Sequence, residues 1–259
     1  MLFTGKEMAE QTIDTYKGPF WRSNGAIFIV IKSLAEAEQV LNKMLREQRV
    51  VDSKLVVFYA KYPPETDTAE SDEVMEEFGD ICDRLWQLEA DLSCCTRTAI
   101  LMAIIELEST VNMLCYFNLG ETVTDTIEGL SLTAKIEVAH RALALPDFKG
   151  THQHRAVRTL LNWRNAFAHG KCTDMPVGSI RDNHLKKPEK YSDPGNEVQE
   201  MLTLLREYLV VSQHLRKISK HPYTSGYHVE LNEIEDRLER LRTFQFDEGQ
   251  LVGRRRPKR

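Results

Sequence analysis

The amino-acid sequence predicts a mainly α-helical fold, and three observations support this prediction. Apolar residues recur from Val74 onward at alternating steps of four and three, which is the spacing of one buried helix face. Helix start and stop signals, such as Ser131 and Gly170, flank several apolar segments. The composition, with 42% hydrophobic and 28% charged residues, is that of a globular protein. We therefore expect a bundle of four to five helices with a small N-terminal α/β or irregular extension.

The N-terminal part of the chain differs in character from the rest. Short runs of β-branched and aromatic residues at 26–31 and 55–59 predict strands, and the segment 34–49 between them predicts a helix. This order favours a small βαβ-like element, or a hairpin with a helix. The alternative is an irregular helical cap, because short apolar runs do not distinguish a strand from a helix.

Domain boundaries are predicted from proline and from changes in polarity. Two adjacent prolines and a polar stretch at 63–72 predict a linker. This linker would separate an extension of unknown role, residues 1–70, from a helical domain, residues 73–246. Residues 247–259 are expected to form a basic flexible tail, which is either a solvated chain end or an auxiliary contact for RNA or an acidic partner.

The helical domain is expected to begin with the apolar stripe between residues 74 and 92. The next helix, 96–118, either continues the first or follows a bend near Ser93. The later helices are expected at 131–143 with Ser131 as a possible N-cap, at 154–168, at 197–219 and at 229–244. A polar loop at 173–195 is expected to be flexible.

The charge of the chain restricts how it could contact nucleic acid. The formal net charge is -5 and the sequence pI is about 5.9, so the protein has no global basic field. A protein that coats duplex nucleic acid through phosphate contacts alone is therefore disfavoured. Any contact with nucleic acid is expected to be local.

The cysteines and the apolar segments predict a cytoplasmic protein that does not span a membrane. The five cysteines form no C-x-x-C pair, and an odd number suits a reducing compartment. The N-terminus lacks the basic and then apolar order of a secretory signal. The most apolar window, Ala99 to Leu119, is interrupted by Glu106, Glu108 and Asn112, which makes it a poor membrane span.

Arg164 stands out because it occupies the middle of an otherwise apolar helix face, between Leu160 and Phe167. A buried unpaired guanidinium costs several kcal/mol or more, so the side chain needs partners. We expect Arg164 to pair with a buried carboxylate, to line a polar cleft or to lie at a subunit interface. Glu108 is the favoured partner, because it too interrupts an apolar stripe of its helix.

The segment around Arg164 resembles the motif of a ribonuclease family. The string from Leu160 to Gly170 contains Arg164, Asn165 and His169, which is similar to the R-x4-H motif of HEPN domains, including the polar residue directly after the Arg and the Gly after the His. The chain is therefore expected to adopt a HEPN-like helical bundle.

Two further segments occur in the order seen in HEPN families, and the similarity covers about residues 74 to 219. Glu108 and Asn112 resemble the Glu-x3-Asn of the long HEPN helix. Lys135 lies in a segment similar to the Leu and Lys segment that follows. The resemblance implies that these three residues support the site.

The resemblance implies metal-independent cleavage of RNA without a cofactor. The 2'-OH of the substrate would attack the adjacent phosphate, leaving a 2',3'-cyclic phosphate and a 5'-OH. His169 would be the general acid or base, and Arg164 would hold the phosphate. Asn165, one helical turn before His169, would position His169 or a phosphate oxygen. A 2'-OH nucleophile makes RNA the expected substrate.

The resemblance also implies partners. HEPN proteins are similar in forming homodimers whose motif helices face each other, which would account for Arg164 on an apolar face. A prokaryotic conflict or stress system, with a possible antitoxin or regulatory protein, is the expected setting. HEPN toxins paired with nucleotidyltransferase antitoxins resemble one another in a Tyr two residues after the His; Lys171 stands here, so that route of control is not expected.

Two other functions remain open from the sequence. One is a non-catalytic HEPN-like module that binds RNA, a nucleotide or a partner protein. The other is a structural helical dimer in which Arg164 pairs with Glu108. The nuclease hypothesis predicts that Arg164 and His169 are exposed to a shared cleft, and the structural one predicts a buried Arg164 with His169 pointing elsewhere.

Other side chains near the motif are weaker candidates. Arg155, Arg158, Trp163 and Lys171 are possible RNA contacts. The two arginines are equally typical of solvated helix charges, and a Trp beside an apolar stripe is more typical of packing. The pair in the His152-Gln-His154 segment lacks further ligands at a recognisable spacing, so no metal site is expected.

Overall fold

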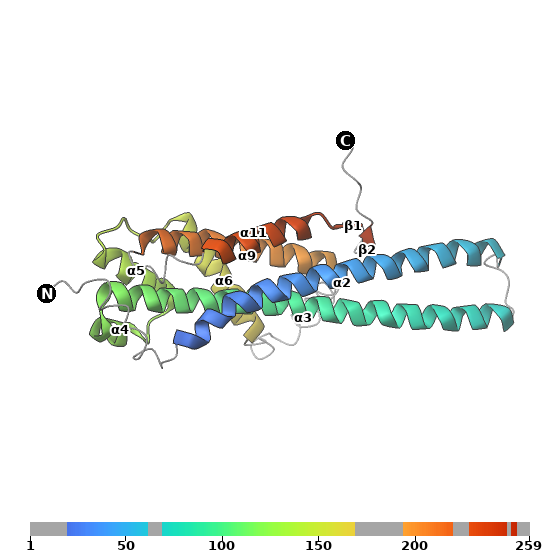
Figure 1. Ribbon diagram of the computed structural model, residues 1–259, viewed down its shortest axis with the longest axis horizontal. Helices are drawn as coiled ribbons and strands as arrows, with labels where there is room; N and C mark the ends of the chain where they lie inside the picture. The colour runs from blue at the N-terminus through green and yellow to red at the C-terminus, as the bar shows by residue number, and fades with distance from the viewer. Residues whose placement is uncertain (1–19, 62–68, 169–193, 220–227, 248–249, 253–259) are drawn as a thin grey trace, which may run out of the picture. The chain divides into compact units, whose positions relative to one another are not determined.

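The computed structural model describes residues 20–61, 69–168, 194–219, 228–247 and 250–252, and most of these residues are helical (Figure 1). The prediction of a mainly α fold is therefore confirmed. The elements in chain order are α2 (Phe20–Lys61), α3 (Ala69–Leu119), α4 (Glu121–Ile127), α5 (Leu132–Ala142), α6 (His152–Ala168), α9 (Pro194–Ile218), α11 (His228–Arg242), β1 (Gln245–Asp247) and β2 (Gln250–Val252).

The predicted N-terminal strands are wrong, because the segments 26–31 and 55–59 both lie within α2, a continuous helix of 42 residues. Periodicity explains the helix: Ala26, Val30 and Leu34 follow each other at steps of four and are all fully buried. Burial of this stripe outweighs the β propensity of the run, since propensity is a weak preference that tertiary context overrides.

α3 is also a continuous helix, of 51 residues, so the predicted helices at 74–92 and 96–118 are one element without an interruption at Ser93. Half of its most apolar window is buried inside the protein. Among the described helices, its Gly79–Leu119 part is long and apolar enough to cross a membrane by length and composition. Burial of this kind is compatible with a core helix of a soluble protein, and the cytoplasmic location stays a prediction.

The later helices largely follow their local signals. α5 begins after Ser131, whose hydroxyl accepts a hydrogen bond from the Ala134 amide at 3.3 Å, so the predicted N-cap is confirmed. α9 begins at Pro194, where proline suits the first helical position because the missing N–H would have no partner. Of the predicted loop at 173–195, residues 173–193 lie outside the described residues, and residues 194–195 belong to α9.

The C-terminal end contains a feature that the sequence did not predict. β1 and β2 pair antiparallel, with Phe246 opposite Leu251. The expectation of a flexible tail from residue 247 is therefore wrong for Asp247 and for residues 250–252. The basic residues after 252 lie outside the described part of the chain.

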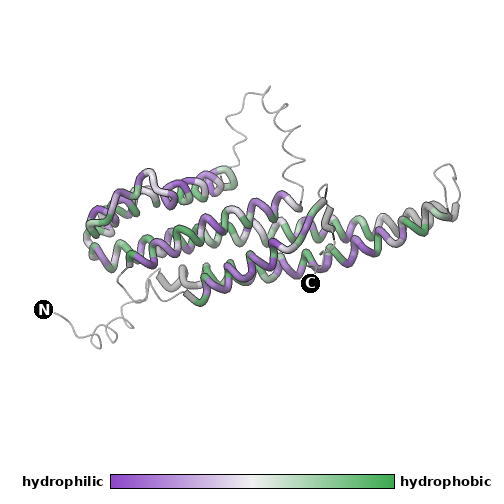
Figure 2. The backbone as a smooth tube through the Cα atoms, turned by 90° about the horizontal axis from the view of Figure 1, so that it is seen from above, coloured by the Kyte–Doolittle hydropathy of each residue, from purple (hydrophilic) through white to green (hydrophobic). Residues whose placement is uncertain are grey.

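The chain divides into two compact units, and those of their limits that fall within the described residues lie inside helices. The first unit contains residues 1–31, 99–172 and 203–235, and the second contains 32–98, 173–202 and 236–259. The predicted boundaries near residues 70 and 246 do not coincide with these limits. Polar and apolar residues alternate along the helices of both units (Figure 2), as expected for helices with one buried face.

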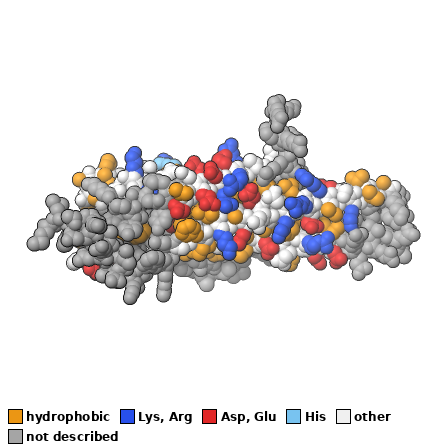
Figure 3. Space-filling view, viewed as in Figure 1, with side chains coloured by type: hydrophobic (Ala, Val, Ile, Leu, Met, Phe, Trp, Pro, Cys, Tyr) orange, Lys and Arg blue, Asp and Glu red, His pale blue; other side chains and the backbone are white. Residues whose placement is uncertain are grey.

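Ion pairs connect helices within each of the two units. In the second unit, ion pairs join helices from distant parts of the sequence: Arg97 Nη2 lies 2.9 Å from Glu197 Oε1, and Arg240 Nε lies 3.3 Å from Glu38 Oε2. Charges of both signs are interspersed on the face shown in Figure 3, which agrees with the absence of a global basic field in the sequence. The first unit contains the described candidate site residues.

Candidate functional site

The candidate site is formed by α6, α3 and α5 of the first unit. Arg164 and Asn165 lie in the last turn and a half of α6, and Glu108 and Asn112 lie one turn apart on α3. Lys135 lies on α5. The structure describes α6 as far as Ala168, so two predicted site residues, His169 and Lys171, lie outside the described residues.

Arg164 and Glu108 form the ion pair that the sequence predicted. Nη1 of Arg164 donates to Oε1 of Glu108, and Nη2 lies 3.4 Å from Oδ1 of Asn165. The two charged side chains are 35% and 38% exposed, so the pair is not buried within a single chain. Partial exposure lowers the desolvation cost of the two charges and leaves them accessible from solvent.

Lys135 and Asn112 form a second link beside this ion pair. Nζ of Lys135 donates to Oδ1 of Asn112 at 2.9 Å, which joins α5 to α3. Cys115, less than one turn further along α3, is buried next to Lys135, and burial raises the pKa of its thiol to about 11, although the Lys135 charge lowers it. The four predicted residues therefore meet in two pairs, Arg164 with Glu108 and Lys135 with Asn112.

The arrangement at Arg164 can bind an anion. A guanidinium has five N–H donors in a planar fork, and the Glu108 contact uses a donor on one nitrogen only. A phosphate could approach the remaining donors from the exposed side. Glu108 opposes such binding through like-charge repulsion, but it also fixes the direction of the fork.

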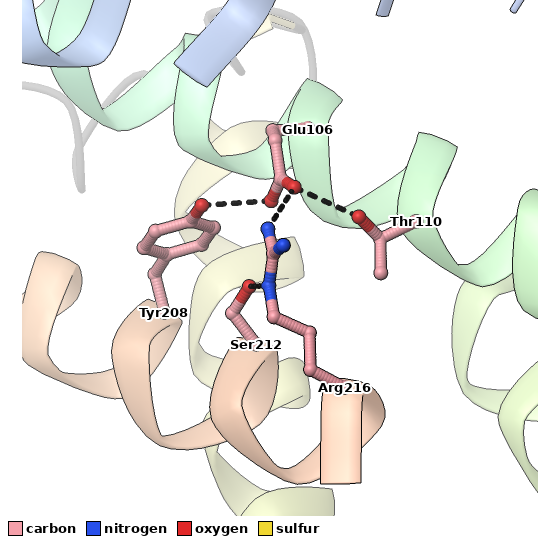
Figure 4. Close-up of polar contacts among 5 residues, drawn as sticks. All are labelled: Glu106, Thr110, Tyr208, Ser212 and Arg216. Carbon is pink, nitrogen blue, oxygen red and sulfur yellow. Dashed lines mark hydrogen bonds and ion pairs between the residues drawn. The ribbon is translucent and has the colours of Figure 1, made fainter. Parts of the chain in front are cut away.

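A buried polar cluster lies on the opposite side of α3, and sequence reasoning missed it (Figure 4). Glu106 accepts hydrogen bonds from Thr110 Oγ1 at 2.8 Å, from Tyr208 OH at 2.7 Å and from Arg216 Nη2 at 2.8 Å. Nε of Arg216 lies 3.5 Å from Oγ of Ser212. The Arg216 and Glu106 side chains are only 1% and 7% exposed. Burial and the Glu106 charge raise the pKa of Tyr208 well above its ordinary value.

The buried cluster had a signal in the sequence. Tyr208, Ser212 and Arg216 follow each other at steps of four, which places three polar groups on one face of a helix. Glu106 and Thr110 have the same spacing on α3. Such matched polar steps on two apolar helices indicate a shared buried network, because buried polar groups need partners.

A histidine pair lies between α5 and α9. Nδ1 of His140 is 2.9 Å from the carbonyl oxygen of Pro146, and its Nε2 is 3.1 Å from Nε2 of His214. A carbonyl only accepts, so Nδ1 of neutral His140 carries the proton and His214 donates to its Nε2. Burial lowers the pKa of His214 from 6.5, as do the charges of His140 and Lys217.

The histidines of the His152-Gln-His154 segment do not form a metal centre with other described residues. Nε2 of His152 lies 3.8 Å from a carboxylate oxygen of Glu207, and the ring of His154 packs edge-on against Phe148. In the part of the chain that the structure describes, no three His, Cys, Asp or Glu side chains gather in a way that could hold a metal ion.

The predicted RNA contacts on α6 differ in exposure. Arg155 and Arg158 are exposed, and Trp163 is half-buried. The Trp163 ring stacks on Phe167, with the centroids 5.2 Å apart and the planes at 4°. Phe167 is exposed as well, but the geometry of these side chains alone does not identify a ligand.

Comparisons of this chain with protein-family models, with curated proteins and with solved structures found no match.

Proposed function

We propose that this protein is a metal-independent endoribonuclease of HEPN type, which cleaves RNA through attack of the substrate's 2'-OH. Arg164, Asn165 and His169 would carry the chemistry, supported by Glu108 and by the Lys135 contact described above. The proposed setting is a cytoplasmic defence or toxin-like stress system, with a homodimer as the working form and an antitoxin or regulatory protein as a further partner.

One observation supports this proposal above the others. The sequence resemblance selected residues on three separate helices, and these residues meet in contacting pairs in the structure. Arg164 of α6 contacts Glu108 of α3, and Lys135 of α5 contacts Asn112, which lies one turn after Glu108 on α3. The contact between Lys135 and Asn112 carries more weight, because the Arg164 and Glu108 pair is also expected from two charges that interrupt apolar helix faces.

The proposed reaction needs a cation at the phosphate and a group that transfers protons. The 2'-oxygen forms a bond to phosphorus as its proton leaves, and the bond from phosphorus to the 5'-oxygen breaks as that oxygen gains a proton. His169 would carry out proton transfer, since imidazole titrates near neutral pH. Arg164 would stabilise the charge on the phosphate oxygens, held in direction by Glu108.

The alternative is a non-catalytic HEPN-like module that binds RNA, a nucleotide or a partner protein. The Glu108 contact favours it, because a carboxylate on the guanidinium reduces the field that an incoming phosphate would meet. The two functions differ in whether RNA is cut, so cleavage is the decisive measurement.

The test compares the purified protein with its His169→Ala and Arg164→Ala variants on mixed RNA in EDTA. Arg242→Ala is the matched control, since it removes an exposed arginine that pairs only with a neighbouring turn of its own helix in the contacts described. The proposal requires cleavage by the parent and the control, with 2',3'-cyclic phosphate ends, and its loss in both site variants. Binding without cleavage by the parent would support the alternative, and equal cleavage by all four proteins would refute the assigned site.

A further inference from the structure

α6 is locally basic within an acidic chain. Its 17 residues include Arg155, Arg158 and Arg164, together with two histidines, and no Asp or Glu. The whole chain has a formal net charge of -5. The helix therefore provides a local positive surface that suits an anionic ligand, although the protein as a whole repels one.

One ridge of α6 connects this charge to an aromatic surface. Arg155, Thr159, Trp163 and Phe167 follow each other at steps of four, so they form one row along the helix. The Thr159 hydroxyl donates to the Arg155 carbonyl oxygen at 3.1 Å and stays close to the helix. The row thus leads from an exposed guanidinium to two rings, over about 12 Å from Arg155 to Trp163.

The two rings stack on each other at the end of this row, and the exposed part of the Phe167 ring is the surface that a ligand would meet. The planes of Trp163 and Phe167 differ by 4°, and the centroid separation of 5.2 Å is that of an offset stack. Phe167 is 44% exposed, although aromatic side chains of this size are usually covered. Stacking on Trp163 restricts the Phe167 ring, so the exposed surface is held in one orientation.

We propose that Trp163 and Phe167 form a stacking platform for an unpaired base of single-stranded RNA, with Arg155 contacting a phosphate further along the strand. The choice of RNA rests on the proposed function, because Arg164 lies beside Trp163 in the sequence and within one turn of Phe167. The platform would hold the base next to the phosphate at Arg164 and would thereby select unpaired segments for cleavage.

Single-stranded RNA fits this surface better than a duplex does. A stacking platform needs a free base face, and the bases of a duplex already stack on each other. Aromatic platforms next to basic residues are the usual means of binding single strands with little sequence preference. The positive charges of α6 then attract the phosphates of the RNA backbone, and the two aromatic rings contact the base.

The experiment uses the full chain with His169→Ala, which prevents cleavage, and with Trp21→Phe and Trp86→Phe, which leave Trp163 as the one fluorescent tryptophan. A short unstructured RNA and the same RNA as a duplex are titrated in EDTA. We expect the single strand to quench Trp163 emission and the duplex to bind more weakly. Phe167→Ala and Phe167→Leu should each raise Kd roughly tenfold or more, while Phe167→Tyr keeps the affinity.

The matched control is Phe28→Ala, which removes another exposed phenylalanine of the first unit and should leave Kd unchanged. Far-ultraviolet circular dichroism checks that each variant folds, and the Leu and Tyr variants keep most of the side-chain volume. Unchanged Trp163 emission on adding RNA, equal Kd for the Leu variant and the parent, or equal binding of duplex and single strand would overturn the platform.

The result separates the platform from the nuclease activity. Cleavage by the unmodified chain with no response of Trp163 would leave the proposed function standing and overturn the platform. Quenching that depends on Phe167, with no cleavage by the unmodified chain, would support the platform within a non-catalytic RNA-binding module. A protein that neither binds nor cleaves the RNA would overturn both.

Discussion

Loss of the Arg216 side chain is expected to destabilise the protein strongly, because it leaves the Glu106 carboxylate buried without its cation. Glu106 is 7% exposed, and of its described hydrogen bonds those from Thr110 and Tyr208 are left when Arg216 Nη2, at 2.8 Å, is removed. Breaking a buried pair in this way costs about 3–5 kcal/mol. We therefore expect Arg216→Met to lower the free energy of unfolding by about that amount, which is a large share of the roughly 5–15 kcal/mol typical of a domain.

The neutral double variant tests the reasoning. Glu106→Gln with Arg216→Met removes both charges and keeps an amide oxygen for the Tyr208 hydroxyl, so the remaining cost should be about 1–2 kcal/mol. Urea unfolding followed by circular dichroism measures each value, and Arg242→Ala, an exposed pair, should cost less than about 1 kcal/mol. The reasoning fails if Arg216→Met costs as little as Arg242→Ala, or if the double variant is less stable than the single one.

Two further predictions concern titrating groups. The pKa of His214 is lowered from 6.5 in the folded state by burial and by the charges of His140 and Lys217, so the unfolded chain takes up a proton first as pH falls. Stability should therefore be complete above about pH 6.5 and decrease as pH falls below it, and His214→Gln should flatten this decrease in urea midpoints measured across the range. Burial raises the pKa of Cys115 to about 11, while Cys82 is exposed. A thiol reagent followed by peptide mass mapping should modify Cys82 in the folded protein and Cys115 only after unfolding, and rapid modification of Cys115 in the folded protein would contradict the described burial.

The sequence predicted those features that depend on local signals. The N-cap at Ser131 followed from one residue and its neighbours, and the structure shows the expected hydrogen bond. The contact between Arg164 and Glu108 was also predictable, because each charge interrupts an apolar face and needs a partner. The exposure of this pair was not predictable, since it depends on how much of the two helix faces other elements cover.

The failures came from tertiary context. The run at 26–31 has the composition of a strand, but its side chains are buried at helical spacing in α2. The Glu106 and Arg216 contact joins residues 110 positions apart, so the sequence showed two polar rows without showing that they meet. His169 lies outside the described residues, so its role in the site remains a prediction from the resemblance.

α3 carries two carboxylates that face different ways, and this limits how the site can respond to a ligand. Glu106 and Glu108 are two residues apart, which turns them by about 200° around the helix. The first is bound to α9 inside the core and the second to Arg164 on α6. Rotation of α3 toward a ligand would break the contacts of Glu106 with α9, so we expect the helix to keep its position. An anion that binds the Arg164 guanidinium would therefore have to replace the Glu108 carboxylate. The side chains would rotate, and the backbone of α3 would stay in place.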